Sequence, residues 1–404
     1  MINLETPKKF KPLATQANQV ATEVFRPISR KYDAAEHAYP KELDMLASLM
    51  DGLDEGAGMG GAGAAGVRRD SNGNDGEGNR NGSNMATVLG IIELCWGDVG
   101  LLLSMPRQGL GNSAIASVAT EEQLEHYGGK WAAMAITEPE AGSDSAAIRT
   151  TAELDGDEYV LNGEKIFVTS GDRADLIVVW ASLDRSKGRA AIKSFIVERD
   201  NPGLKLDRLE HKLGIRASDT ANFTLQDCRV PKEALLGSPE IDTKAGFGGA
   251  MQTFDNTRPL VAAMAVGVTR AALEETRKRL GEASVAIDYD RPALSQHAAA
   301  ARYLEMEADY EAAHLLTLQA AWMADNAKPN SLQASMAKAK AGRTCVDVTL
   351  GCVELCGSVG YGENELLEKW ARDAKILDIF EGTQQIQLLI VARQLLGKSS
   401  SELR

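Results

Sequence analysis

The stretch TTAELDGDEYVLNGEKIFVT, residues 150–169, decides the fold prediction because the periodicity of the sequence changes there. Residues 14–50 and 85–132 carry apolar side chains at helical spacing, whereas apolar and polar residues alternate within this stretch. Asp-Gly-Asp at 155–157 and Asn-Gly at 162–163 separate the alternating runs, and Asn-Gly between such runs is a strong hairpin signal. We therefore expect antiparallel strands joined by tight turns.

Strand-like runs continue as far as Leu236, at residues 176–181, 193–198 and 221–227. After Gly249 the pattern becomes helical, and the predicted helices cover 259–281, 295–327, 331–356 and the residues from 383 onward. Alanine-rich faces and short connections in this last part indicate a four-helix bundle. We predict an α+β fold, mainly α, with an N-terminal helical domain (1–132), a middle antiparallel β-domain (133–243) and a C-terminal four-helix bundle (244–404).

A low-complexity segment at residues 51–84 interrupts the N-terminal helical pattern, with 11 glycines and almost no large apolar side chain. Burial cannot offset the ordering entropy of such a segment, so we expect a mobile loop. Gly58, Gly60 and Gly63 match the dinucleotide-binding pattern GxGxxG, but this pattern is meaningful only between a strand and a helix. Neither flank has the pattern of a strand, so no Rossmann domain is expected.

The composition argues against several classes of protein. Asp and Glu number 57 and Lys and Arg 44, and the formal net charge of -13 disfavours nucleic acid or anionic membranes as partners. No apolar run reaches the roughly 18 residues of a membrane span, and MINLETPKKFKP lacks a signal-peptide core, so we expect a cytoplasmic protein. The five cysteines form no CxxC pair and the five histidines no HxxxH spacing, so no metal site is expected.

Glu381 is the most informative single residue. It follows Ile379 and Phe380 in LDIFEGTQQIQLLIVARQLLG, residues 377–397, just before a helical pattern. One interpretation is an acid stabilised by the helix macrodipole, worth about 0.3–1 kcal/mol. The other is a catalytic base, because apolar surroundings raise the pKa of a carboxyl group and make it a better proton acceptor.

Two further stretches have residue types that local structure does not require. AMAITEPEAGSDSAA contains Thr137, Gly142 and Ser143, whose hydroxyls and accessible backbone N–H groups suit a polar cofactor or a phosphate. KIFVTSG places Phe167 and Thr169 on one side of a strand, where they would stack on and hydrogen-bond to a flat ring. The structural alternatives are an ordinary turn between domains and simple packing on a sheet face.

TFDNTRP, residues 253–259, places Asp255, Thr257 and Arg258 at the start of a predicted helix. One interpretation is an N-cap Asp or Asn with a solvated arginine, and the other is part of a binding site. Local chemistry leaves both interpretations open.

Together these stretches resemble the acyl-CoA dehydrogenase family. TEPEAGSD, NGEKIFVTSG, HKLGIRASDT, RVPKEALLG, FDNTRP and RDAKILDIFEGTQQIQLLIVAR occur in the order and at the spacing of that family, over about residues 95–397. The resemblance implies the three-part fold given above, with FAD and an acyl-CoA thioester between the β-domain and the bundle. It also implies dimers or tetramers in which each FAD reaches a neighbouring subunit, and an electron-transferring flavoprotein as electron acceptor.

The resemblance assigns roles by position. Glu381 matches the family's base, which removes the α-proton of the thioester while the β-hydrogen leaves as hydride to the flavin. Some relatives place the base at the position of Thr257, and a threonine there favours Glu381. The residues implied to bind FAD are Ala135, Thr137, Gly142, Ser143, Phe167, Thr169, Thr383 and Gln385. The residues implied to bind the substrate are Ser143, Phe254, Asp255, Thr257, Arg258 and Gly382.

The sequence departs from the family where the family contacts the FAD of a neighbouring subunit. The Arg, Phe, Gly and Gln of that motif, and a further Gln and Gly, are replaced by Ala286, Tyr289, Asp290, His297, Glu354 and Ser358. An arginine bound to a pyrophosphate forms a strong charge-assisted pair, and its loss weakens FAD binding unless Arg291 takes its place. We therefore predict either a homo-oligomer or a hetero-oligomer in which a related subunit supplies the adenosine half of the site.

The leading prediction is an FAD-dependent acyl-CoA dehydrogenase that forms a trans-2-enoyl-CoA. The alternatives are a weakly catalytic partner subunit of a hetero-oligomeric acyl-CoA dehydrogenase and an acyl-CoA oxidase on the same scaffold. Straight-chain, branched and steroid-like acyl groups all stay open as substrates.

Overall fold

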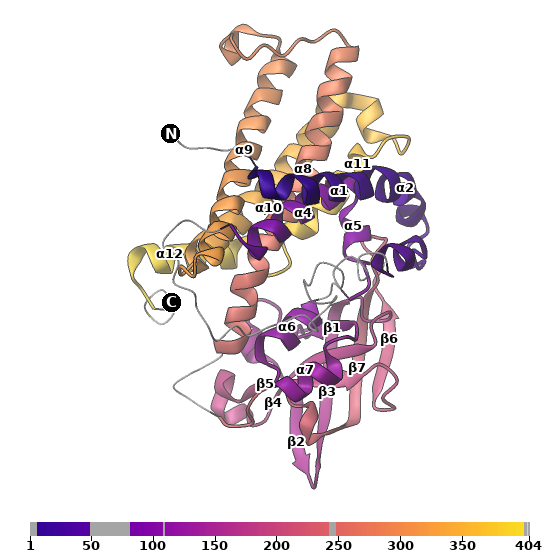
Figure 1. The fold of residues 1–404 in the computed structure, drawn as a ribbon, viewed down its shortest axis with the longest axis vertical. Helices are drawn as coiled ribbons and strands as arrows, with labels where there is room; N and C mark the ends of the chain where they lie inside the picture. Colours follow the sequence, from indigo (N-terminus) through magenta and orange to yellow (C-terminus); the bar gives the residue numbers. More distant parts are fainter. Residues whose placement is uncertain (1–5, 49–80, 108–109, 242–247, 400–401, 403–404) are drawn as a thin grey trace.

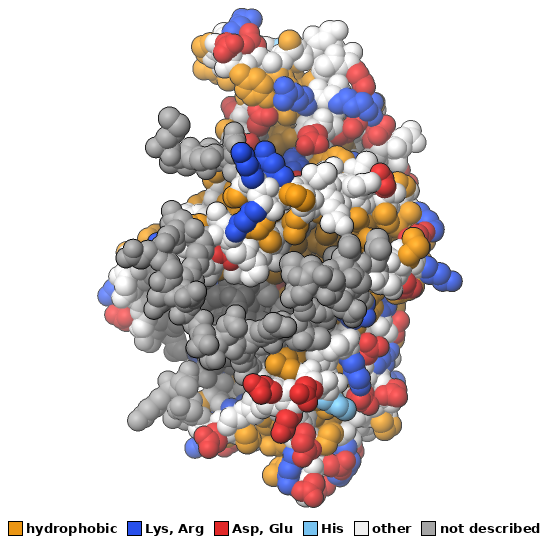
Figure 2. All heavy atoms as spheres, in the orientation of Figure 1, with side chains coloured by type: hydrophobic (Ala, Val, Ile, Leu, Met, Phe, Trp, Pro, Cys, Tyr) orange, Lys and Arg blue, Asp and Glu red, His pale blue; other side chains and the backbone are white. Residues whose placement is uncertain are grey.

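The structure is a computed structural model. It describes residues 6–48, 81–107, 110–241, 248–399 and 402, and for residues 248–256 it describes the backbone alone. The predicted loop at 51–84 therefore lies almost entirely outside the described residues. In Figure 1 the long C-terminal helices extend upward, the β-sheet lies below, and the N-terminal helices cross between them. Figure 2 shows basic and acidic side chains interspersed on the same face. Within the described residues, no helix is long and apolar enough to cross a membrane.

The N-terminal part is helical, as predicted. It comprises α1 (Lys11–Val20), α2 (Arg26–Ala34), α4 (Ser83–Gly97), α5 (Val99–Leu102), α6 (Leu110–Val118) and α7 (Glu121–Tyr127), and a π-helical turn joins α1 to α2. Helix α7 begins with a capping box, in which Thr120 and Gln123 bond each other's backbone N–H. Helix α4 packs against the C-terminal helices, whereas α6 packs against the sheet.

The middle part is one curled sheet of seven strands in the order β1-β4-β2-β3-β7-β6, with β5 paired to β4. The strands are β1 (Ala132–Ala135), β2 (Thr151–Asp155), β3 (Glu158–Thr169), β4 (Leu176–Ser182), β5 (Ile192–Glu198), β6 (Leu204–Leu209) and β7 (Thr220–Pro231). Most pairs are antiparallel, as predicted, but β4 runs parallel to β1 and to the start of β2. The turn predicted at 155–157 joins β2 to β3, with Gly156 at φ 64°.

The second predicted turn, Asn162-Gly163, is wrong. Strand β3 runs straight through it, and the pairing with β7 shifts register between Leu161 and Gly163. Gly163 has a φ of 156° and packs so closely on Thr150 that a Cβ atom would overlap it. Glycine is therefore required here by a bulge and by the close approach of Thr150 to the strand. Both are common reasons for glycine within a strand.

The C-terminal part contains α8 (Gly248–Glu282), α9 (Ala298–Asp325), α10 (Ser331–Tyr361), α11 (Leu367–Leu377) and α12 (Gln384–Leu396). Helix α10 packs against α8, α9, α11 and α12, and small buried alanines allow this close packing. Helix α10 is interrupted at Gly357, where φ is 56°. The sequence pattern predicted all of these helices except α11, whose C-terminal end leads to Glu381.

Candidate active site

Glu381 lies between α11 and α12 in a strained backbone conformation. The φ angle is 56° at Glu381 and 92° at Gly382. Positive φ is uncommon for a residue with a side chain, and such strain clusters at functional sites. Helix α12 begins only after this turn, where the Thr383 side chain accepts a hydrogen bond from the backbone N–H of Ile386 (3.4 Å). The cap of α12 is thus Thr383, whereas the Glu381 carboxylate accepts its hydrogen bond from Thr257 of α8, so capping of α12 does not account for the carboxylate.

Two fully buried side chains hold this turn. Lys338 on α10 donates from Nζ to the Gly382 carbonyl oxygen (2.7 Å). Gln387 on α12 donates from Nε2 to the carbonyl oxygens of Glu381 (2.9 Å) and Gly382 (3.2 Å). Burial lowers the pKa of Lys338 to about 8, although the charges of Asp378 and Glu381 raise it. A buried ammonium is costly unless it is bonded, so this contact fixes the backbone beside Glu381.

The Glu381 carboxylate faces residues of α8. Thr257 Oγ1 donates a hydrogen bond to Glu381 Oε2 (2.8 Å), and Thr257 and Arg258 are both buried. Burial raises the pKa of Glu381, while the Thr257 hydrogen bond and the charges of Arg258 and Lys338 oppose the rise only in part. A carboxylate with a raised pKa is a stronger proton acceptor than an exposed glutamate, so the site can act as a base.

Phe167 occupies a bulge in β3. Its φ is 58°, its backbone N–H donates to Asn222 Oδ1 (3.2 Å), and its side chain is 59% exposed. The bulge, between Lys165 and Val168, breaks the simple alternation on which the prediction of a shared face rested. Thr169 follows on the same strand and is half-buried. An exposed aromatic ring and a half-buried hydroxyl two residues later on the same strand suit a planar heteroaromatic ligand.

The loop after β1 is anchored to β3 by a buried ion pair. Glu138 accepts hydrogen bonds from Lys165 Nζ (2.7 Å) and from the backbone N–H of Thr150 (3.0 Å). The backbone N–H of Ile166 donates to the Thr137 carbonyl oxygen (2.9 Å). The sequence prediction missed Glu138 and Lys165, although a Glu and a Lys inside apolar-flanked runs are a possible signal for a buried pair. Their contact places Thr137 beside the strand that carries Phe167.

The predicted site residues thus fall into two groups in different parts of the fold. Thr257, Arg258, Gly382 and Thr383 surround Glu381 in the C-terminal helices, and Gln385 lies exposed in the first turn of α12. Ala135 is buried in β1, whereas Gly142 and Ser143 are exposed, and a Cβ atom at Gly142 would meet nothing within 4 Å. The side chains of Phe254 and Asp255 lie outside the described residues.

Family comparisons identify this arrangement. The model "Acyl-CoA dehydrogenase, middle domain" matches residues 133–228, and "Acyl-CoA dehydrogenase, C-terminal domain" matches residues 244–396. The chain belongs to the acyl-CoA dehydrogenase family. The resemblance noted from the sequence motifs is therefore confirmed, as is the predicted three-part fold class.

Individual relatives agree with this assignment. The short-chain specific acyl-CoA dehydrogenase of Clostridium acetobutylicum is 36% identical over 78% of this chain and 83% of that protein. Subunit CarC of the caffeyl-CoA reductase–Etf complex of Acetobacterium woodii is 35% identical over 80% of this chain and 85% of that protein. The structure of butyryl-CoA dehydrogenase from Megasphaera elsdenii superposes with a TM-score of 0.81 at 30% identity, covering 98% of this chain and 100% of that chain.

Acyl-CoA dehydrogenases are FAD-dependent oxidoreductases, so the predicted enzyme class and cofactor are also confirmed. The residues of this acyl-CoA dehydrogenase fit a flavin on one side: the exposed ring of Phe167, the hydroxyl of Thr169 and the accessible backbone at Gly142. A flat ring stacked on such an exposed aromatic side chain removes apolar surface of both rings from water.

Proposed function

We propose that this acyl-CoA dehydrogenase uses Glu381 to remove the α-proton of an acyl-CoA thioester and forms a trans-2-enoyl-CoA. The observation that supports this role best is the carboxylate itself, bonded to Thr257 at 2.8 Å, with a pKa that burial raises. The α-proton passes to the carboxylate, the β-hydrogen leaves with its electron pair, and a carbon–carbon double bond forms. When bound, FAD supplies the acceptor for that hydride.

The strained turn at Glu381 has a further role in this proposal. An α-proton is a weak acid, so the developing enolate oxygen needs fixed hydrogen-bond donors. We assign one donor to the backbone N–H of Glu381, whose peptide neighbours are held by Lys338 and Gln387. Arg258 and Thr257, together with Phe254, Asp255, Ser143 and Gly382, are proposed to line the path of the substrate.

The other predicted site residues are proposed to hold FAD. Phe167 would lie against the flavin ring, and Thr169 would bond near its reactive nitrogen. The remaining contacts to FAD are assigned to Ala135, Thr137, Gly142, Ser143, Thr383 and Gln385.

The variant Glu381→Gln tests this function, with Glu153→Gln on the exposed face of β2 as the matched control. We expect the first change to lower kcat by about 100- to 10,000-fold and the second to leave kcat unchanged. The assay uses an artificial electron acceptor and a panel of acyl-CoA thioesters that begins with butyryl-CoA, because relatives are named short-chain specific. Full turnover by the Glu381→Gln variant would assign catalysis to another subunit, as in the partner-subunit alternative.

An electron-transferring flavoprotein is the proposed electron acceptor. CarC is named as a subunit of an Etf complex. A solved structure described as an electron transferring flavoprotein of Acidaminococcus fermentans superposes with a TM-score of 0.81 at 32% identity, covering 98% of this chain and 100% of that chain. Reduction of an added electron-transferring flavoprotein by substrate is the expected result. Hydrogen peroxide formed in air at the full rate of turnover would instead favour the oxidase alternative.

We further propose that a related subunit completes the FAD site. In the loop between α8 and α9, Arg291 donates from Nη2 to the Ser295 carbonyl oxygen (2.8 Å). Tyr289 donates to Glu307 (3.0 Å), and the adjoining groove is lined by Glu307 and Glu311. Acidic side chains at a surface that would meet a pyrophosphate repel it, which supports a partner with a different sequence there.

The FAD content of purified protein separates the two kinds of oligomer. We expect the chain expressed alone to hold little FAD, and co-expression with a related subunit to give about half the FAD per chain that a homo-oligomer would hold. A homo-oligomer with one FAD per chain would refute the hetero-oligomer while leaving the role of Glu381 intact.

A further inference from the structure

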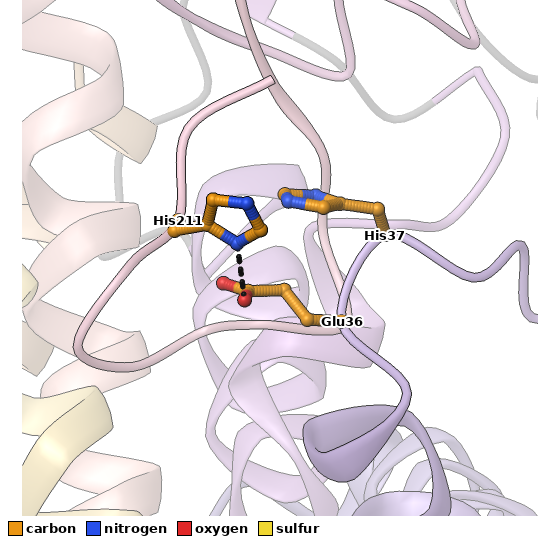
Figure 3. Close-up of side chains that lie close together, drawn as sticks. All are labelled: Glu36, His37 and His211. Atoms are coloured by element: carbon orange, nitrogen blue, oxygen red, sulfur yellow. Dashed lines mark hydrogen bonds and ion pairs between the residues drawn. The ribbon is translucent and has the colours of Figure 1, made fainter. Parts of the chain in front are cut away.

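Three potential metal ligands meet away from the candidate active site. Glu36 and His37 follow α2, and His211 follows β6 (Figure 3). The Nδ1 atom of His211 lies 2.8 Å from Oε2 of Glu36, and the ring centroids of His37 and His211 are 5.0 Å apart. One ligand atom from each residue can be chosen so that all lie within 4.8 Å of one another. The sequence shows no metal-binding spacing because His211 is far along the chain from the other two residues.

His37 has properties of a ligand without a partner. Both of its ring nitrogens are buried, and neither has a hydrogen-bond partner among the residues that the structure describes. Its φ of 70° places it in the left-handed region, and its carbonyl oxygen accepts from Arg173 Nη2 (3.4 Å). Buried polar atoms without partners are rare in proteins, and each needs a physical explanation. A bound cation supplies one for the ring nitrogen that carries the lone pair in a neutral imidazole.

Glu36 is oriented for the same position. Its Oε1 atom accepts from the backbone N–H of Lys212 (2.8 Å), which leaves Oε2 directed at His211. Metal-binding carboxylates are held in this way by further hydrogen bonds. The other charged groups near the cluster are Lys212, Arg216 and Asp219. Lys212 donates its ammonium to the Ser218 carbonyl oxygen (2.7 Å).

We propose that Glu36, His37 and His211 form a binding site for a divalent transition-metal ion, with Zn²⁺ as its representative. Two imidazoles and one carboxylate are a common ligand set for such ions. Bonds of about 2.0–2.2 Å place neighbouring ligand atoms roughly 3–3.5 Å apart. The Glu36 and His211 ligand atoms are slightly closer than this, at 2.8 Å, and the His211 side chain, 83% exposed, can rotate to open the pair toward His37. The same exposure leaves the remaining coordination positions to water.

The metal would connect two parts of the molecule. Glu36 and His37 belong to the N-terminal helical part, whereas His211 belongs to the loop after β6. An ion that binds only the folded state stabilises it in proportion to the logarithm of its concentration relative to Kd. The site therefore acts on stability, and its presence does not depend on the proposed role of Glu381.

Zn²⁺ titration of the full-length, untagged protein after removal of metals tests this proposal. Isothermal titration calorimetry is expected to show one Zn²⁺ per chain, and saturating Zn²⁺ is expected to raise Tm. Both effects are expected to disappear in His211→Ala, which changes an exposed side chain and leaves folding intact, and in Glu36→Gln. His126→Ala, an exposed histidine on α7, is the control and is expected to bind as the unchanged protein does.

Two outcomes would overturn the proposal. One is the absence of Zn²⁺ binding by the unchanged protein. The other is equal binding by His211→Ala, since the ion would then lie elsewhere, for example at the cysteines. Circular dichroism of each variant confirms that a loss of binding does not reflect a loss of fold.

Discussion

Glu381 combines two features that oppose folding, a backbone with φ 56° and a half-buried side chain whose pKa is raised by desolvation. Residues in such conformations persist only where their surroundings hold them. Here the surroundings are the side chains of Lys338 and Gln387 below the turn and the hydroxyl of Thr257 at the carboxylate. A strained residue that its neighbours hold in place is typical of active sites. There the protein gives up some folding stability for activity.

Glu381→Gln is therefore expected to stabilise the protein while it lowers kcat. The folded state raises the pKa of Glu381, so its ionisation destabilises the fold as the pH rises from the unfolded pKa, about 4.3, through the folded pKa. The neutral amide removes this effect, and we expect Tm at pH 8 to rise by roughly 1–3 °C. Well below the unfolded pKa of about 4.3 the difference should vanish, because Glu381 is then uncharged in both the folded and the unfolded state. An equal Tm at both pH values would show that the carboxylate is solvated.

Lys338→Met tests whether the lysine positions Glu381. Without the bond to the Gly382 carbonyl oxygen the turn can shift, and a shift near 1 Å costs about 100-fold in kcat. Loss of the positive charge also raises the pKa of Glu381, so the acid limb of the kcat/KM profile should move to higher pH. Lys340→Met, which removes a surface ion pair with Asp309, is the control and should change neither. A lower Tm with an unshifted pH profile would mean that Lys338 is only structural.

At the scale of elements, the sequence predicted what local pattern determines and missed what distant pairing determines. The turn at 155–157 and the long strands β4 and β7 follow from short-range signals. Strand β1 is Ala-Ala-Met-Ala, which has no alternation, and it exists because β4 pairs with it in parallel. Asn162-Gly163 became a bulge because β7, some 60 residues later, pairs along the whole of β3. In the site, the family resemblance predicted the role of Glu381. It predicted none for Lys338, because a lysine among helix-forming alanines has the pattern of an ordinary surface residue.

Gly163→Ala should reveal the close approach at this bulge. The added Cβ atom would overlap Thr150 and would occupy a φ of 156°, so strand β3 must shift against its neighbours. We expect the free energy of unfolding to fall by about 1–3 kcal/mol, measured by urea denaturation. Gly129→Ala, where a Cβ atom would meet nothing within 4 Å, is the matched control. Equal stability of both variants would contradict the close packing of β3 on Thr150.

At the scale of the whole molecule, one buried polar cluster joins all three parts of the chain. Lys369 on α11 forms ion pairs with Asp98 (2.8 Å) and Asp373 (2.5 Å). Asp98 also accepts from Ser29 on α2, and Asp373 accepts from the backbone N–H of Ile215 in the loop after β6 (2.5 Å). Burial raises the pKa of Asp373, and the negative charge of Asp98 adds to the rise, whereas the Lys369 ammonium opposes it. Helix α11, which the sequence did not predict, is thus tied to the N-terminal helices and to the β-domain.

Lys369→Met should consequently weaken the entire fold. The change leaves two carboxylates buried without their cation, and breaking a buried pair in this way costs about 3–5 kcal/mol. We expect the midpoint of urea denaturation to fall, and activity to be lost at the same denaturant concentration, because α11 leads directly into the turn at Glu381. Lys398→Met removes an exposed ion pair with Glu402 and should leave the midpoint unchanged. If Lys369→Met unfolded at the midpoint of the unchanged protein, the buried cluster would contribute little to joining the three parts. The connection would then rest on the other contacts of α11, namely the Arg372–Asp33 ion pair (2.6 Å) and the apolar packing of Trp370.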